Sequence, residues 1–109
     1  MSKNQGIYIM ITTCGTREDA YRLARLVVER RLAACSQVSG PITSFYWWEG
    51  KLEEDQEFQV KFKLPASLCQ KTEDFIREVH PYELPQIIAL QADKTLVEYE
   101  RWVVAETDG

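Results

Sequence analysis

The sequence is poor in cysteine, glycine and proline and has no long apolar run, and each shortage excludes a class of protein. Its three cysteines form no C-x-x-C pair and cannot all pair with one another, which is typical of reduced thiols rather than of a disulfide-stapled secreted domain. Five glycines and four prolines in 109 residues exclude collagen-like and low-complexity chains. No segment approaches the roughly 20 apolar residues that span a bilayer, and no signal-peptide pattern opens the chain. We therefore expect a cytoplasmic protein with no membrane partner.

Positive charge is also scarce. The 13 lysines and arginines are outnumbered by 17 acidic residues, which gives a net charge of −4 and a pI near 5.0. An acidic chain without an aromatic RNP motif is a poor candidate for binding nucleic acid. A P-loop, a G-x-S-x-G motif and the glycine-rich anion loop of acylphosphatases are all missing from the sequence, so we expect no enzyme. The hydrophobic content of 45% is typical of one globular domain spanning residues 1–109.

Hydrophobic periodicity predicts a regular alternation of strands and helices. The clearest strand covers residues 57–64, where Phe58, Val60 and Phe62 alternate with polar side chains. Thr16 is the predicted N-cap of the first helix, and Gly40-Pro41 predicts a bulge in the second strand region. In chain order, we predict a strand at 7–13, a helix with its apolar stripe at 20–32, a strand region at 35–48, a turn at 49–50, a strand at 57–64, a helix at 66–79, a strand at 86–92 and a helix at 95–105.

This order is β-α-β-β-α-β followed by one more helix, which is the pattern of an α+β ferredoxin-like βαββαβ sandwich with an extra C-terminal helix. Right-handed crossovers would put the first two helices on one face of a four-stranded antiparallel sheet. The other face needs a cover, because the aromatic residues of the segment 44–48 would otherwise form a large exposed apolar patch. We therefore expect self-association into a closed, symmetric oligomer.

His80 is the only histidine, and it begins the most distinctive segment of the chain, HPYELP at residues 80–85. A neutral imidazole at this position is a candidate metal ligand or proton shuttle. Composition alone favours the structural alternative, in which a lone histidine before a proline caps the preceding helix or satisfies a buried carbonyl. The acidic residues at 53–57 lack the spacing of a calcium loop and are typical of a solvated surface. The tryptophans are typical of a core or a subunit interface.

Several motifs, all in register along the chain, resemble the CutA family of divalent cation tolerance proteins. They are LAAC at 32–35, Tyr46 with WEGK at 48–51, Glu57, HPY at 80–82 with Pro85, and Trp102. The resemblance extends from about Ile7 to Trp102 and is specific only when the motifs are taken together. It implies a ferredoxin-like protomer, a tight homotrimer similar to that of PII signalling proteins, and a link to copper and other divalent metals.

The resemblance also implies a metal site. In the bacterial members associated with copper, the proposed ligands are a cysteine of the first strand, a glutamate of the third strand and the histidine of His-Pro-Tyr. The last two match Glu57 and His80. The cysteine position falls on Thr12, and Cys14, two residues along the same strand face, is the third candidate ligand. Because Thr12 supplies no thiolate, we expect weak binding of copper or another divalent cation, in a metal tolerance or response role.

A second hypothesis needs no metal. A trimeric scaffold or signalling module would hold a small ligand or a protein partner in clefts between its subunits. The candidate cleft residues, which have polar or charged tips, are Trp48, Lys63, Tyr82 and Glu83. Trimer geometry alone would explain the aromatic residues and the prolines, so the sequence leaves both hypotheses open.

Overall fold

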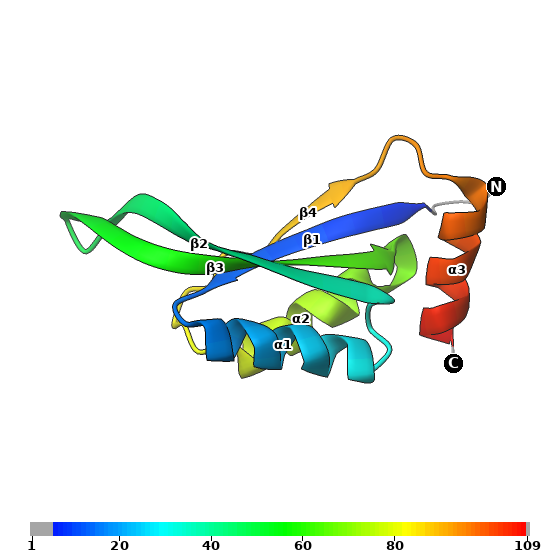
Figure 1. Cartoon of the computed structure of the whole chain (residues 1–109), viewed down its shortest axis with the longest axis horizontal. Helices are drawn as coiled ribbons and strands as arrows, with labels where there is room; N and C mark the ends of the chain where they lie inside the picture. The colour runs from blue at the N-terminus through cyan, green and yellow to red at the C-terminus, as the bar shows by residue number, and fades with distance from the viewer. Residues whose placement is uncertain (1–5, 109) are drawn as a thin grey trace.

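A computed structural model describes residues 6–108 as a four-stranded antiparallel sheet with two helices on one face (Figure 1). The strands lie in the order β2-β3-β1-β4, and a third helix closes the end of the sheet near both chain termini. In chain order the elements are β1 (Ile7–Cys14), α1 (Arg17–Glu29), β2 (Cys35–Trp48), β3 (Lys51–Pro65), the 3-10 helix η1 (Ala66–Leu68), α2 (Cys69–Val79), β4 (Ile88–Gln91) and α3 (Val97–Asp108). The predicted α+β ferredoxin-like sandwich with an extra C-terminal helix is confirmed.

The alternating segment 57–64 lies inside β3 and supplies much of the core. Val60, Phe62 and Leu64 are fully buried, and Met10 of β1 lies opposite Phe62 in the antiparallel register. Val27 of α1 packs into the same apolar cluster, which joins the helices to the sheet. The period of two therefore predicted correctly which side of β3 faces the helices.

The predicted N-cap of α1 is confirmed, because Thr16 Oγ1 accepts a hydrogen bond from the backbone N–H of Asp19 at 3.1 Å. The helix is shorter than its apolar stripe suggested, however, and ends at Glu29. Arg31 has a φ of 60°, a left-handed conformation that terminates the helix. Leu32 is buried, so it belongs to the core although it lies outside the helix.

Three other boundaries differ from the predictions. The helix expected from residue 66 begins as a 3-10 turn and becomes α-helical only at Cys69. The strand expected at 86–92 is limited to β4, which pairs with residues 8–11 of β1. Strand β3 begins at Lys51 and not near residue 57, because the tight turn at Glu49-Gly50, both at positive φ, pairs the acidic segment with the aromatic half of β2.

The β2–β3 hairpin extends past the helices as a two-stranded arm (Figure 1). The register of the two strands shifts between residues 39 and 42, which confirms the bulge predicted at Gly40-Pro41. Beyond this shift the large apolar side chains are in solvent: Phe45 is 66% exposed and Trp47 is 72% exposed. The arm therefore contributes little to the core of its own protomer.

Within the described residues, the sheet face opposite the helices is uncovered where β4 pairs with β1, as predicted. Ile88 and Leu90 of β4 lie beside Ile11 and Ile9 of β1 on this face, and both β4 side chains are about half exposed. The end of the sheet near the chain termini is different, because α3 packs there through the buried Val103 and its Tyr99 contacts Cys35 of β2.

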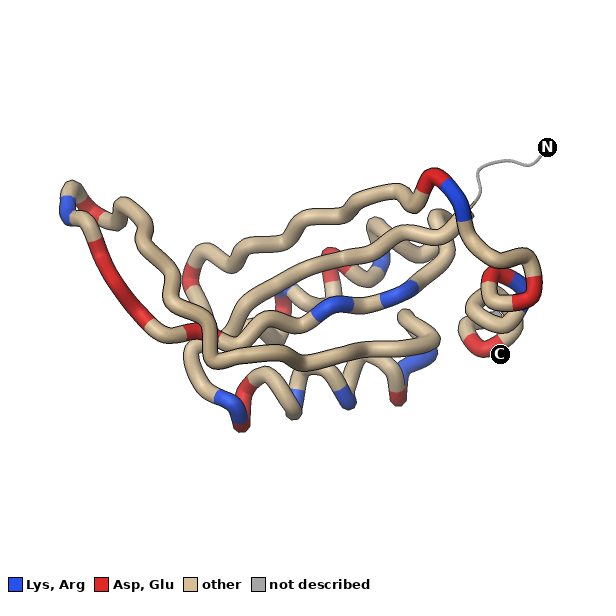
Figure 2. Tube along the Cα trace, turned by 45° about the horizontal axis from the view of Figure 1, so that its top comes forward, with Lys and Arg blue, Asp and Glu red and all other residues tan. Residues whose placement is uncertain are grey.

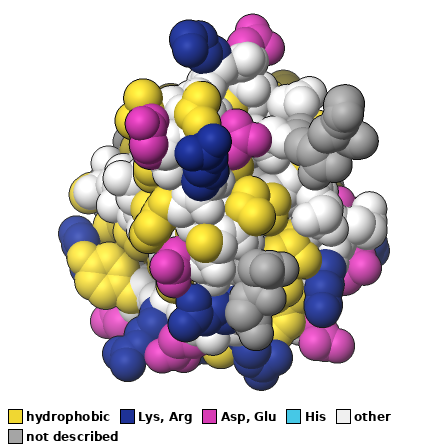
Figure 3. All heavy atoms as spheres, turned by 90° about the vertical axis from the view of Figure 1, so that its right-hand side faces the viewer, with side chains coloured by type: hydrophobic (Ala, Val, Ile, Leu, Met, Phe, Trp, Pro, Cys, Tyr) yellow, Lys and Arg dark blue, Asp and Glu magenta, His cyan; other side chains and the backbone are white. Residues whose placement is uncertain are grey.

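Helix α3 is also tied to the chain by an ion pair between Arg31 Nη1 and Glu106 Oε1 at 2.9 Å. Hydrophobic, acidic and basic side chains are interspersed over this end of the molecule (Figure 3). None of the helices within residues 6–108 has the length and apolar character that a membrane crossing requires.

Candidate functional site

His80 lies at the end of α2, where the chain turns into an extended conformation before Pro81. Its Nε2 lies 2.9 Å from the backbone oxygen of Thr13, and its Nδ1 lies 3.0 Å from the backbone nitrogen of Tyr82. The backbone N–H of Tyr82 can only donate, so Nδ1 accepts and Nε2 carries the proton that it donates to Thr13. Burial lowers the pKa of His80, which keeps the ring neutral. His80 thus satisfies a buried backbone carbonyl, which is the structural alternative predicted for a lone histidine.

Cys14 lies beside this histidine, with its Sγ 3.9 Å from His80 Nε2. The thiol is fully buried at the end of β1, and this burial raises its pKa from 9.0 to about 11. A thiol in such an environment is protonated at neutral pH and is a poor nucleophile. As a metal ligand it would first have to lose its proton.

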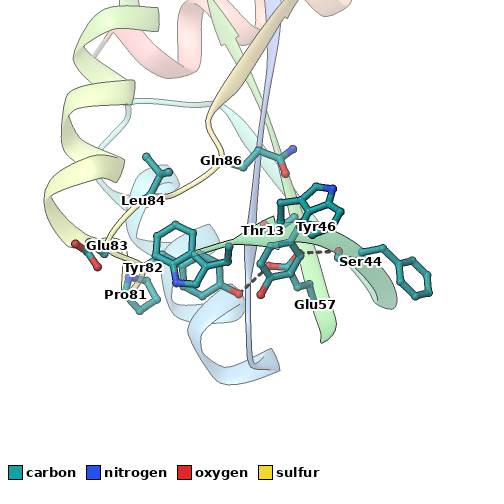
Figure 4. A pocket seen from close by; sticks show the side chains of 12 residues that line it. Thr13, Ser44, Tyr46, Glu57, Pro81, Tyr82, Glu83, Leu84 and Gln86 are labelled. Atoms are coloured by element: carbon teal, nitrogen blue, oxygen red, sulfur yellow. Dashed lines mark hydrogen bonds between the residues drawn. The ribbon is translucent and has the colours of Figure 1, made fainter. Parts of the chain in front are cut away.

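Glu57 is buried on β3, with only 8% of its surface exposed. One carboxylate oxygen accepts from Ser44 Oγ at 2.7 Å, and the other accepts from the Tyr82 hydroxyl at 2.7 Å (Figure 4). Burial and the bond to Glu57 raise the pKa of Tyr82, so this phenol remains a donor. Tyr82 therefore links the His80 loop to the carboxylate of β3.

Thr12, at the family's cysteine position, is fully buried on the same strand face as Cys14. Its Oγ1 is the one buried side-chain polar atom without a hydrogen-bond partner in the part of the chain described. Thr12 therefore carries a buried hydroxyl that no group within residues 6–108 satisfies.

The structure brings two of the three predicted metal ligands, Cys14 and His80, into contact. Glu57 is joined to the pair only through Tyr82, and its two oxygens are occupied by hydroxyl donors. Across residues 6–108, no three His, Cys, Asp or Glu side chains converge to hold a metal ion. The donor set of one protomer is thus incomplete, and the ligand assignment stays a prediction.

A cleft of about 690 Å³ lies between the hairpin arm and the loop after α2 (Figure 4). It is lined by Thr13, Ser44, Phe45, Tyr46, Trp47, Trp48, Glu57, Pro81, Tyr82, Glu83, Leu84 and Gln86. Three of the four predicted cleft residues are here, namely Trp48, Tyr82 and Glu83.

Lys63, the fourth predicted cleft residue, is not part of this cleft. It lies six residues along β3 from Glu57, about 20 Å in a strand that rises about 3.3 Å per residue. Its Nζ donates to Gln37 Oε1 on β2 at 2.7 Å, and its backbone pairs with Cys35. Lys63 is therefore far from the cleft of its own protomer, and its place in a cleft between subunits stays a prediction.

Ser44 and Tyr46 were not predicted as site residues, and both lie on the arm face that carries Glu57. Tyr46 donates to Asp55 Oδ2 at 2.6 Å, and this bond is the main reason that its pKa rises to about 12. A usable signal was present, because the turn at 49–50 fixes the hairpin register and places Tyr46 opposite Glu53. The contact between Tyr82 and Glu57 had no such local signal, since 25 residues separate the two.

Known proteins resemble this chain over most of its length. Human "Protein CutA" is 44% identical over 96 residues, which are 88% of this chain and 54% of the human protein. The "Divalent-cation tolerance protein CutA" of Pyrococcus horikoshii is 35% identical over 99 residues, 91% of this chain and 96% of that protein. The chain thus spans about half the length of the mammalian relatives and nearly all of the archaeal one.

Solved structures agree with these sequence relatives. The crystal structure of the divalent ion tolerance protein CutA1 from Ehrlichia chaffeensis matches with a TM-score of 0.90 at 31% identity, covering 96% of this chain and 98% of that chain. A structure described as the periplasmic divalent cation tolerance protein CutA from Archaeoglobus fulgidus matches with a TM-score of 0.88 at 32% identity, covering 93% and 98%. The family model of the CutA1 divalent ion tolerance protein matches residues 8–106. Since this match covers nearly the whole chain, the protein belongs to the CutA1 family.

Proposed function

We propose that this protein acts in divalent-cation tolerance by binding copper or another divalent cation weakly. The observation that carries the proposal is the contact between Cys14 and His80, a thiol and an imidazole 3.9 Å apart next to a buried carboxylate. Thiol and imidazole are the side chains that copper and zinc prefer. Membership of a family described by divalent ion tolerance supports the same role.

Weak binding follows from what each ligand must give up. To ligate through Nε2, His80 would have to carry its single proton on Nδ1, and it would lose both its bond to the Thr13 oxygen and the bond that it accepts from the Tyr82 backbone N–H. Cys14, whose pKa is raised to about 11, would have to lose its proton. Both costs reduce the apparent affinity at neutral pH, and the deprotonation of Cys14 predicts that metal uptake releases a proton.

Calorimetric titration with Cu(II), Cu(I) and Zn(II) tests the proposal. Repeating the titration in buffers of different ionisation enthalpy counts the protons released per metal. His80→Gln keeps a donor for Thr13 but should lose the binding, whereas Cys69→Ser removes a half-buried thiol of α2 and should bind like the parent. Metal uptake that is unchanged in His80→Gln would disprove the ligand assignment.

We also propose that the protein is a homotrimer in the cytoplasm. The uncovered sheet face and the exposed aromatic residues of the arm support assembly, because monomers rarely expose apolar patches of this extent. Three free cysteines support a reducing compartment. Light scattering on a dilution series should give one species of three times 12.7 kDa, and a monomer at micromolar concentration would contradict assembly.

A second candidate function, ligand binding in the cleft beside Glu57, is favoured by a separate observation. The cleft has the volume of a small-molecule site and an aromatic wall with a few convergent polar groups. Both candidates describe a binding protein and assign no catalytic step to the chain.

A further inference from the structure

The cleft beside Glu57 has an unusual combination of walls and charge. Its aromatic lining consists of Phe45, Tyr46, Trp47, Trp48 and Tyr82. Its charged lining consists of two carboxylates, Glu57 and Glu83, and it includes no lysine, arginine or histidine. The cleft is therefore an aromatic site of negative charge, and its charged side chains repel an anionic ligand.

Glu57 is the central charge of this site. It is 8% exposed, and its two oxygens accept from the neutral hydroxyls of Ser44 and Tyr82. The ion pairs formed within the described residues all lie elsewhere, on α1 and between Arg31 and Glu106. A carboxylate removed from water in this way is normally compensated by a cation. Each carboxylate oxygen has two lone pairs, so Glu57 retains the capacity to accept a further donor.

The surroundings strengthen the negative field. The outer half of β3 carries Glu53, Glu54 and Asp55 in succession, which form the continuous acidic stretch of the arm (Figure 2). Tyr46 and Tyr82 remain protonated phenols, since the pKa of each is raised. Both rings line the cleft as neutral aromatic groups and add no positive charge.

We propose that this cleft binds an organic ammonium cation, held by the Glu57 carboxylate and the faces of the surrounding aromatic rings. Alkylated ammonium groups are weakly hydrated and gain from both interactions, whereas a hydrated divalent metal ion needs several converging oxygen ligands that the cleft lacks within the described residues. The volume of about 690 Å³ admits a small organic molecule. This inference deepens the second candidate function and does not depend on metal binding at Cys14 and His80.

Choline and its neutral isostere 3,3-dimethylbutan-1-ol form a matched pair of probes, because they have nearly the same shape and differ in charge. Tryptophan fluorescence reports binding, since Trp47 and Trp48 line the cleft. The Trp102→Phe variant removes the one tryptophan outside the cleft and serves as the parent for the titrations. At constant ionic strength, choline should bind with a millimolar dissociation constant and the isostere about tenfold more weakly.

Two variants locate the interaction. Glu57→Gln should weaken choline binding by about tenfold and leave binding of the neutral isostere nearly unchanged. Glu29→Gln makes the same chemical change on α1, at an exposed carboxylate paired with Arg25, and should have no effect. Circular dichroism establishes that each variant is folded.

Each outcome decides a different claim. Equal affinity for choline and the isostere in the parent protein would overturn the cation inference while leaving a ligand cleft in place. Failure of both probes to bind at high millimolar concentration would overturn the cleft function itself. The metal titration with His80→Gln stands apart from both results, because it reports on the first candidate function.

Discussion

The two halves of the β2–β3 ribbon differ sharply although they belong to the same two strands. On the inner side of the register shift, Val60 and Phe62 are fully buried beneath the helices. On the outer side, Phe45 and Trp47 are 66% and 72% exposed, and the facing strand carries consecutive acidic residues. The bulge at 39–42 is the border between them.

This difference shows that apolar side chains in one sheet have two roles, one in the core and one at the surface. The inner half has a complete set of neighbours from α1, α2 and β1, so its burial stabilises the protomer. The outer half has an aromatic surface that the described part of its own chain does not cover. Its side chains are available to contact a second copy of the chain or line the cleft beside Glu57. Stability and function should therefore respond separately to mutations in the two halves.

The largest effect should come from a cavity in the inner half. Phe62→Ala removes a fully buried ring and should lower the free energy of unfolding by about 3–5 kcal/mol, measured by urea denaturation. Phe45→Ala is the matched change in the outer half and should have a far smaller effect in the protomer. Equal losses at low protein concentration would break the distinction between the halves.

A charge placed in the outer half should act on assembly instead. Trp47→Glu replaces the most exposed aromatic ring of the arm by a carboxylate. Light scattering should then detect smaller species, while the circular dichroism spectrum remains that of the folded chain. Tyr21→Glu, at an exposed aromatic residue of α1, is the control and should keep the parent mass. If both variants keep it, the arm is not an assembly surface.

His80 connects the core to the cleft, and its titration should appear in stability. Burial lowers its pKa in the folded state, so the unfolded chain binds the proton more readily. Stability from this group is full above the unfolded pKa of about 6.5 and is lost as the pH falls from there through the folded pKa. Urea midpoints of the parent should therefore fall more steeply in this window than those of His80→Gln, and parallel curves would exclude the effect.

The smallest change concerns two buried threonines of the core beside the inner half, Thr12 on β1 and Thr72 on α2. Thr12→Val removes the hydroxyl without a partner and should raise the unfolding free energy by about 1 kcal/mol. Thr72→Val removes a hydroxyl that donates to the Leu32 oxygen at 3.2 Å and should lower it by a similar amount. If thermal denaturation shows that both variants gain stability or that both lose it, then the hydrogen bond of Thr72 is not the cause of the difference between the two sites.

Local patterns explain what could be predicted from the sequence. The alternation at 57–64 and the Thr16 cap depend on neighbours a few residues away, and both are confirmed. The predicted end of α1 was wrong, because the backbone conformation of Arg31 ends the helix earlier. The predicted start of β3 was also wrong, because the turn at 49–50 pairs with β2 an acidic segment whose sequence is typical of a solvated surface.

The site was harder to predict, because its contacts join distant segments. The bond of His80 to the Thr13 oxygen spans 67 residues, and that of Tyr82 to Glu57 spans 25. Composition correctly suggested that a lone histidine satisfies a buried carbonyl, but not which one. Lys63 lies far along β3 from Glu57 in the protomer, so only the assembled oligomer can test its predicted place in a cleft between subunits.

The acidic outer half of β3 has a consequence for the newly made chain. The hairpin register sets Glu54 against Phe45 and Glu53 against Tyr46, so acidic residues accompany two rings of an aromatic segment that would otherwise stack readily into fibrils. Repulsion between identical arms disfavours parallel stacking of copies that leave the ribosome close together. The same charges permit a defined association that is closed by symmetry, and they oppose one that grows without limit.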